Sequence, residues 1–107
     1  MKKTIIVLAL LSLFSAGCVS TGKNFSADAT KNIKKNSTTR SQIHGWFGYP
    51  YMTGIDNGDT TWIYNYSKSS VAGKVMVKDL YIVFDENGVV KNFTFSTSFP
   101  DEMKLTK

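Results

Sequence analysis

The chain has 107 residues, with 13 Lys and Arg against 8 Asp and Glu, so its formal net charge is +5. This length predicts one small domain. The basic residues are scattered, and the sequence has no stripe of arginines interleaved with stacking aromatics. Composition and charge therefore argue against a nucleic-acid-binding protein.

The first 17 residues have the features of a secretion signal. Lys2 and Lys3 supply a positive end. Residues 5–14 are almost entirely apolar, and residues 15–17 are small, as a signal peptidase requires. About ten apolar residues are too few for a stable bilayer-spanning helix, which takes about 20. We predict a signal peptide over 1–17; the alternative is a short hydrophobic helix or membrane anchor.

The only cysteine, Cys18, follows this segment directly. The sequence "SAGC" resembles the lipobox of bacterial lipoprotein precursors, which implies a diacylglyceryl group on the Cys18 thiol and cleavage just before it. The alternative is ordinary secretion with a free thiol. Two or three acyl chains give stable membrane anchoring, whereas one does not. Val19, rather than Asp, follows the cysteine, which resembles an outer-membrane sorting signal. We expect residues 18–29, rich in small and polar residues, to form a lipidated, flexible tether.

Two short helices are expected next. The segment Ala27–Lys35 has a weak helical pattern. Thr39 and Gln42 match a capping box, which predicts a second helix over Arg40–Phe47. Gly48 ends this helix. Trp46 is expected in the core with the other apolar residues of this helix.

Alternating residues and turn signals follow. Asn57-Gly58 predicts a tight turn, and Asp85–Gly88 predicts a second one. The extended segments are Tyr51–Ile55, Thr60–Tyr66, Val75–Asp85 and Val89–Ser98. We predict an α+β fold with two short N-terminal helices packed on one face of a three-stranded antiparallel sheet. The expected domain spans 30–100, with a C-terminal tail over 101–107.

Residues for catalysis are lacking in the sequence. The single histidine, His44, lies beside the apolar face of a short predicted helix and has no metal-ligand partner at a workable spacing. The carboxylates Asp56, Asp59, Asp85 and Glu86 fall in turn sequences. Trp62, like Trp46, is expected to be core rather than a ligand platform. We predict a protein that is not an enzyme and has no metal or cofactor.

Two groups of residues are candidates for binding a partner. Tyr49 and Tyr51 flank Pro50 at a helix-to-strand junction, where exposed tyrosines would suit a protein interface; alternatively, their rings fold back onto the helix. Basic residues gather around the first predicted helix and its loop: Lys31, Lys34, Lys35 and Arg40. These four could meet anionic phospholipid headgroups, or they form a solvated face.

Three segments, "NIKKNSTTRSQIHGWFGYP", "DTTWIYNY" and "LYIVFDENGVVKNFTFS", together resemble the SmpA/OmlA family, also called BamE-like lipoproteins. The matching residues are Thr39, Arg40, Ile43, Gly48, Pro50, Trp62, Tyr64, Phe84, Asp85, Gly88 and Val90. The resemblance covers about Ile33 to Ser96. Asn36 stands where the family usually has glycine, and asparagine tolerates the left-handed backbone conformation.

The resemblance implies a two-helix, three-strand domain on a lipid anchor. It further implies a non-catalytic accessory that faces the periplasm from the outer membrane and assists the assembly of outer-membrane β-barrel proteins. Family members of this kind contact another lipoprotein and phosphatidylglycerol headgroups. The alternative is an envelope-stress or inhibitor-type lipoprotein that binds a periplasmic or surface protein, since the same fold occurs in secreted β-lactamase inhibitors and fold alone does not fix the partner.

Overall fold

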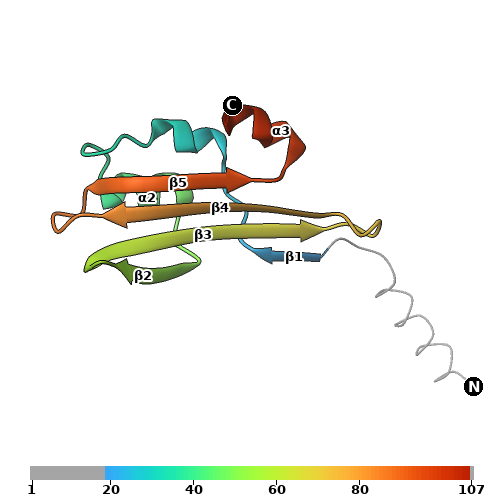
Figure 1. Ribbon diagram of the computed structural model, residues 1–107, viewed down its shortest axis with the longest axis horizontal. Coiled ribbons are helices and arrows are strands. Elements are labelled where there is room, and N and C mark those ends of the chain that lie inside the picture. The colour runs from blue at the N-terminus through green and yellow to red at the C-terminus, as the bar shows by residue number, and fades with distance from the viewer. Residues whose placement is uncertain (1–18, 107) are drawn as a thin grey trace, which may run out of the picture.

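A computed structural model describes residues 19–106, which form a five-stranded antiparallel sheet with short helical segments (Figure 1). The strands are β1 (Val19–Gly22), β2 (Met52–Asp56), β3 (Asp59–Ser69), β4 (Val75–Phe84) and β5 (Val90–Thr97). The helical segments are the 3-10 helix η1 (Asp28–Asn32), α2 (Arg40–Phe47), α3 (Pro100–Met103) and the 3-10 helix η2 (Lys104–Thr106).

The sheet is organised around β3. Along one side, β3 pairs with β4, and β4 in turn pairs with β5. The other edge of β3 pairs with two separate strands, since β2 runs from Met52 opposite Ile63 to the turn, and β1 reaches Gly22 opposite Tyr66. The strands β1 and β2 therefore lie end to end along one edge of the sheet (Figure 1), with a gap between them.

Both predicted turns are present. Asn57 and Gly58 have φ values of 50° and 87°, as a two-residue hairpin turn requires. At the β4–β5 turn, the Asp85 carboxylate accepts hydrogen bonds from the backbone N–H groups of Asn87 (2.9 Å) and Val89 (3.0 Å). The Asp85 carboxylate thus stabilises the turn in which it lies.

The core lies between one face of the sheet and the chain segments that cross it. Leu80, Ile82 and Phe84 share this face, as their alternation predicts, and all three are fully buried. They pack with residues from the N-terminal segment, α2 and the neighbouring strands: Phe25, Ile33, Ile43, Phe47, Tyr64 and Val90. The ring of Phe25 contacts three aromatic rings, those of Phe47, Tyr64 and Phe95.

The predicted fold of two N-terminal helices on a three-stranded sheet is wrong. The first expected helix, Ala27–Lys35, contains only the 3-10 helix Asp28–Asn32, after which Ile33 is extended with ψ 121°. A segment with one large apolar residue has too little packing to offset helix nucleation. The sheet has five strands because the segment at Tyr51–Ile55 pairs with β3 and β1 adds a further strand. The C-terminal segments α3 and η2 were not anticipated.

The segment expected to be a flexible tether is ordered from Val19 onward. Residues 19–22 form β1, and the side chains of Phe25 and Ala27 are only 7% and 5% exposed. Strand pairing uses backbone groups, so a polar sequence can join a sheet edge without an apolar pattern. Cys18 and the predicted signal peptide over 1–17 lie outside the described residues.

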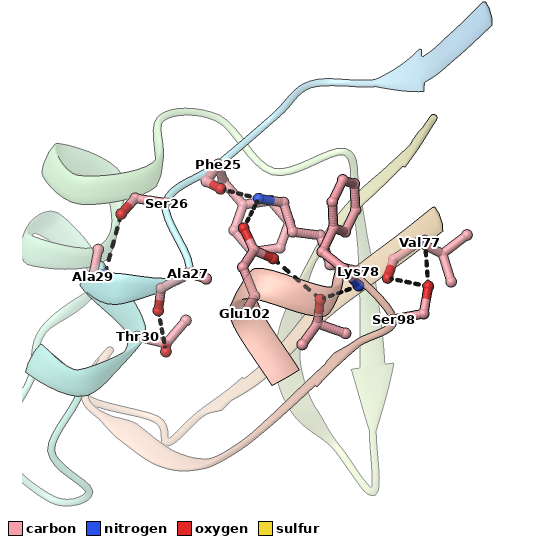
Figure 2. A network of polar contacts seen from close by, with 11 residues as sticks. Phe25, Ser26, Ala27, Ala29, Thr30, Val77, Lys78, Ser98 and Glu102 are labelled. Atoms are coloured by element: carbon pink, nitrogen blue, oxygen red, sulfur yellow. Dashed lines mark hydrogen bonds and ion pairs between the residues drawn. The ribbon is translucent and has the colours of Figure 1, made fainter. Parts of the chain in front are cut away.

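A buried lysine joins the N-terminal segment to the C-terminal helix. The side chain of Lys78 on β4 is only 3% exposed, and its Nζ donates to the carbonyl oxygen of Phe25 and pairs with Glu102 Oε1 at 3.0 Å (Figure 2). Thr97 donates to the other carboxylate oxygen of Glu102 at 3.1 Å. Residues 101–106, expected to be a tail, are therefore attached to the sheet through Glu102.

Candidate protein-docking surface

The end of α2 is fixed by local sequence signals. The capping box is confirmed: Gln42 N–H donates to Thr39 Oγ1 at 3.3 Å, and Thr39 N–H donates to Gln42 Oε1 at 2.9 Å. At the other end, Gly48 has φ 78°, and its N–H donates to the carbonyl oxygen of His44 at 2.8 Å. These contacts stop the helix after Phe47.

A pocket of about 250 Å³ opens where α2 ends. Its lining residues are Lys23, Phe47, Tyr49, Pro50, Tyr51, Tyr64 and Asn65. Tyr64 and Asn65 lie on β3 opposite the gap between β1 and β2, so the pocket occupies a notch in the sheet edge.

The inner side of the pocket is uncharged. The Tyr64 hydroxyl donates to the carbonyl oxygen of Gly48 at 2.8 Å, and burial raises the pKa of Tyr64 to about 12. The phenol therefore stays protonated at physiological pH. The cationic group among the lining residues is Lys23, an exposed residue of the N-terminal segment.

The predicted tyrosines lie together at this pocket and are accessible. Tyr49 is 80% exposed, Tyr51 is 52% exposed and the adjacent Met52 is 51% exposed. The ring of Tyr49 meets His44 edge-on with 4.5 Å between ring centroids, so it touches the helix while most of its surface faces solvent. We call residues 49–52 the Tyr49–Met52 surface. Aromatic residues and methionine are enriched at protein interfaces, and this surface presents both types beside a pocket.

The two tryptophans differ from each other. Trp62 packs against the core with partial burial, with its ring 5.1 Å from that of Phe84. Trp46 is 37% exposed, so its predicted place in the core is wrong. The buried face of α2 is provided by Ile43 and Phe47, four residues apart. Trp46, one residue before Phe47, points away from that face because successive helix residues are rotated by about 100°.

The predicted basic residues lie at the other end of α2. The Arg40 guanidinium lies over the rings of Trp62 and Phe84, at 5.9 Å and 5.3 Å from their centroids. Lys34 and Lys35 are exposed residues of the loop before α2. Eight helical residues span about 12 Å, so the structure does not gather Lys34, Lys35, Arg40 and the two tyrosines into one site.

The acidic residues of the described part of the chain are spread over turns and ion pairs. Over residues 19–106, no group of three or more His, Cys, Asp or Glu side chains is placed to hold a metal ion. In the same range, no helix is long and apolar enough to cross a membrane. Three of the turn carboxylates have structural partners: Asp59 pairs with Lys91 at 2.8 Å, Asp56 accepts from the Tyr81 hydroxyl at 3.0 Å, and Asp85 orders its own turn.

Sequence reasoning missed Lys23 and Met52 as members of the site. Lys23 was assigned to the tether, and its place at the pocket depends on β1 pairing with β3. Met52 falls within the predicted extended segment Tyr51–Ile55 without any signal of a binding role, and its position on the edge strand β2 leaves half of its surface exposed. The side chains in residues 49–52 are exposed because β2 lies at the edge of the sheet. A local sequence pattern does not reveal which strand forms an edge.

Comparison with known proteins identifies one family. The family model described as "Outer membrane protein assembly factor BamE domain" matches residues 22–94, more than half of the chain. The match includes the residues around the pocket and ends before α3. The family is one of non-catalytic assembly factors, which agrees with a chain that is not an enzyme, and it supports a general role in outer-membrane protein assembly. A search of curated proteins gives no match to this chain.

Proposed function

Because the chain belongs to the BamE domain family, we propose that it is an outer-membrane-anchored lipoprotein that assists β-barrel protein assembly as a non-catalytic accessory. The single observation that carries this proposal is the family match over residues 22–94, which includes all of β2, β3 and β4 and most of β5. The protein would work by docking to another component of the assembly machinery from the periplasmic side of the outer membrane.

The proposed anchor is Cys18. Its support is the sequence: a positively charged and apolar segment over 1–17, small residues before the cysteine, and Val19 after it. Since β1 begins at Val19, the folded domain would start immediately after the acylated residue. Two or three acyl chains would hold it stably at the membrane.

The proposed docking surface is the Tyr49–Met52 surface and the pocket beside it. A partner side chain of apolar character would fill the notch between β1 and β2, where Tyr49 and Tyr51 supply rigid contact area. Exposed aromatic residues next to a pocket are typical of positions that dominate interface energies. Lys34, Lys35 and Arg40 would form a second, separate contact with acidic groups of the partner protein.

Affinity purification of the lipidated protein tests this function. We expect a barrel-assembly subunit to co-purify with the wild-type protein, and Tyr49→Ala/Tyr51→Ala to reduce its recovery at least tenfold. Met103→Ala is the matched control. Met103 on α3 is 48% exposed, a fraction similar to that of Tyr51, and α3 lies at the opposite edge of the sheet from β2 (Figure 1). This variant should recover as much partner as the wild type.

Two results would count against the proposal. If no barrel-assembly subunit co-purifies and deletion leaves outer-membrane protein composition and detergent resistance unchanged, the accessory role fails. Specific recovery of a periplasmic enzyme or surface protein in its place would support the inhibitor-type alternative. Mass spectrometry of the mature amino terminus independently tests acylation of Cys18.

A further inference from the structure

The strand β1 and the β3–β4 hairpin meet at the same end of the sheet. Val19 is paired with Ser69, the last residue of β3. Cys18 is bonded to Val19, and consecutive Cα atoms are about 3.8 Å apart. An acyl anchor on Cys18 would therefore be joined to the end of β1 that lies beside the hairpin tip, residues 70–74.

The hairpin tip has a defined turn. Ser70 N–H donates to the carbonyl oxygen of Lys74 at 2.9 Å, and Gly73 N–H donates to that of Ser70 at 3.0 Å. The Ser70 hydroxyl also accepts from the Lys74 N–H at 3.3 Å. These bonds hold the tip in one shape and leave its side chains directed outward.

This end presents exposed apolar and basic side chains among small polar residues. Val71 is 80% exposed and Val75 is 62% exposed, and Val19 on the neighbouring strand is 68% exposed. Lys68 and Lys74 flank the tip, and residues 67–77 contain no Asp or Glu. Exposed valines with flanking lysines and no acidic residue suit the interface of an anionic bilayer, where apolar side chains enter the headgroup boundary and lysines meet phosphates.

The opposite end of the sheet carries charges of both signs, including Arg40 beside Gly88 and Lys91 paired with Asp59. The β2–β3 and β4–β5 turns lie there, about 33 Å away along β3. Four acidic residues gather in or beside these turns: Asp56, Asp59, Asp85 and Glu86. The loop with Lys34 and Lys35 is also at that end, because Asn36 N–H donates to the carbonyl oxygen of Val90 at 2.7 Å. A negative bilayer surface would therefore favour the hairpin end, where lysines occur without acidic neighbours in residues 67–77.

We propose that the β3–β4 hairpin tip is a membrane-contact site for the anionic phospholipid bilayer that holds the anchor. Val71 and Val75 enter the headgroup boundary, and Lys68 and Lys74 bind anionic headgroups. This proposal rests on the proposed acylation of Cys18. Together, the anchor and the hairpin give two points of attachment, so the sheet stands away from the bilayer with the β2–β3 and β4–β5 turns toward the periplasm.

A spin label at the tip tests the contact. In the lipidated protein, acylation blocks the Cys18 thiol, so Val71→Cys or Asn87→Cys provides a single labelling position at the near or far end of the sheet. Each labelled protein is reconstituted into vesicles of phosphatidylglycerol and phosphatidylethanolamine. The accessibility of the nitroxide to a water-soluble nickel chelate and to oxygen is then measured by electron paramagnetic resonance.

We expect the label at position 71 to be several-fold less accessible to the nickel chelate than the label at 87, and more accessible to oxygen. Lys68→Glu/Lys74→Glu should abolish this protection in anionic vesicles, since each lysine near such a surface contributes about fivefold in binding. Lys34→Glu/Lys35→Glu makes the same charge change at the other end and should leave it intact.

The outcomes separate the two proposals. An acylated protein whose label at 71 is as accessible to nickel as the label at 87 overturns the hairpin contact and leaves the anchor standing. Loss of protection only with Lys34→Glu/Lys35→Glu also overturns it and assigns headgroup binding to the loop before α2. A mass spectrum showing free Cys18, with the label at two positions, overturns the anchor and the hairpin contact that depends on it.

Discussion

Lys78 and Glu102 form an ion pair of 3.0 Å between two very differently exposed side chains: the lysine is 3% exposed and the carboxylate 23%. Aromatic rings surround the ammonium group, at 4.9 Å from the Phe25 centroid and 5.2 Å from that of Phe99. The lysine has no access to water that could replace a lost partner, whereas the glutamate does. The pair should therefore be sensitive mainly to loss of the carboxylate.

Removing the carboxylate should lower the free energy of unfolding. We expect Glu102→Gln to cost about 2–3 kcal/mol, because a buried ammonium group loses its charged partner. Lys78→Met/Glu102→Leu should cost less than Glu102→Gln alone, since it leaves no unpaired charge in the core. Urea denaturation followed by circular dichroism measures both values.

Lys91→Met is the matched control for this pair. Lys91 pairs with Asp59 at 2.8 Å, but its side chain is 58% exposed. Pairs at the surface contribute about 0–1 kcal/mol, so the control should change stability little. A Glu102→Gln protein as stable as the Lys91→Met protein would show that Lys78 does not depend on Glu102.

Phe25 should hold β1 on the sheet. Its ring packs among Phe47, Tyr64 and Phe95, and its carbonyl oxygen accepts from Lys78. Replacing a buried Phe by Ala costs about 3–5 kcal/mol. We expect Phe25→Ala to release the preceding residues and to speed tryptic cleavage after Lys23 by at least tenfold.

Phe25→Leu keeps most of the apolar volume and provides a folded comparison if Phe25→Ala unfolds the whole domain. It should give intermediate cleavage after Lys23 with the rest of the chain still protected. Trp46→Ala, at a partly exposed aromatic position, should leave this cleavage unchanged. Equal cleavage of wild type and Phe25→Leu after Lys23 would indicate that β1 is held by strand pairing alone.

What the sequence predicted well was local. The capping box at Thr39, the turn at Asn57-Gly58 and the buried face of β4 each depend on residues close together in the chain. What it missed depends on long-range pairing: β1 joins Ser69, some fifty residues away, and gains its place from backbone bonds that any sequence can make. Exposure of Tyr49 and Tyr51 is one of the two alternatives that the sequence leaves open, and the pocket beside them also needs Lys23, which directly follows the unpredicted strand β1.

Asn36 shows how a departure from the family pattern is accommodated. It has φ 65°, in the left-handed region, and its N–H donates to the carbonyl oxygen of Val90 at 2.7 Å. Asparagine tolerates this region better than other residues with side chains, and glycine tolerates it fully. We expect Asn36→Gly to be neutral or slightly stabilising and Asn36→Ala to cost about 1 kcal/mol, measured by thermal denaturation. An alanine variant as stable as the glycine variant would show that the loop changes its backbone conformation.

Tyr64 should make stability depend on alkaline pH. Its pKa is raised by burial from 10.0 to about 12. A raised pKa in the folded state means that the stabilising contribution is complete below about pH 10 and is lost as pH rises toward 12. Tyr64→Phe removes this ionisation together with the hydrogen bond to Gly48, which contributes about 1 kcal/mol. We therefore expect the wild type to be more stable than Tyr64→Phe at pH 8, and this difference in the free energy of unfolding to shrink between pH 10 and 11.5.

The difference between the two proteins is the informative quantity, because the contributions of all groups that they share cancel in it. Tyr66→Phe serves as the control for loss of a tyrosine hydroxyl, since Tyr66 is only partly buried and stacks on Phe99. If the difference between wild type and Tyr64→Phe also stays constant from pH 8 to 11.5, the hydroxyl ionises without penalty. The inner side of the pocket would then be open to water, and an apolar partner side chain would not be expected there.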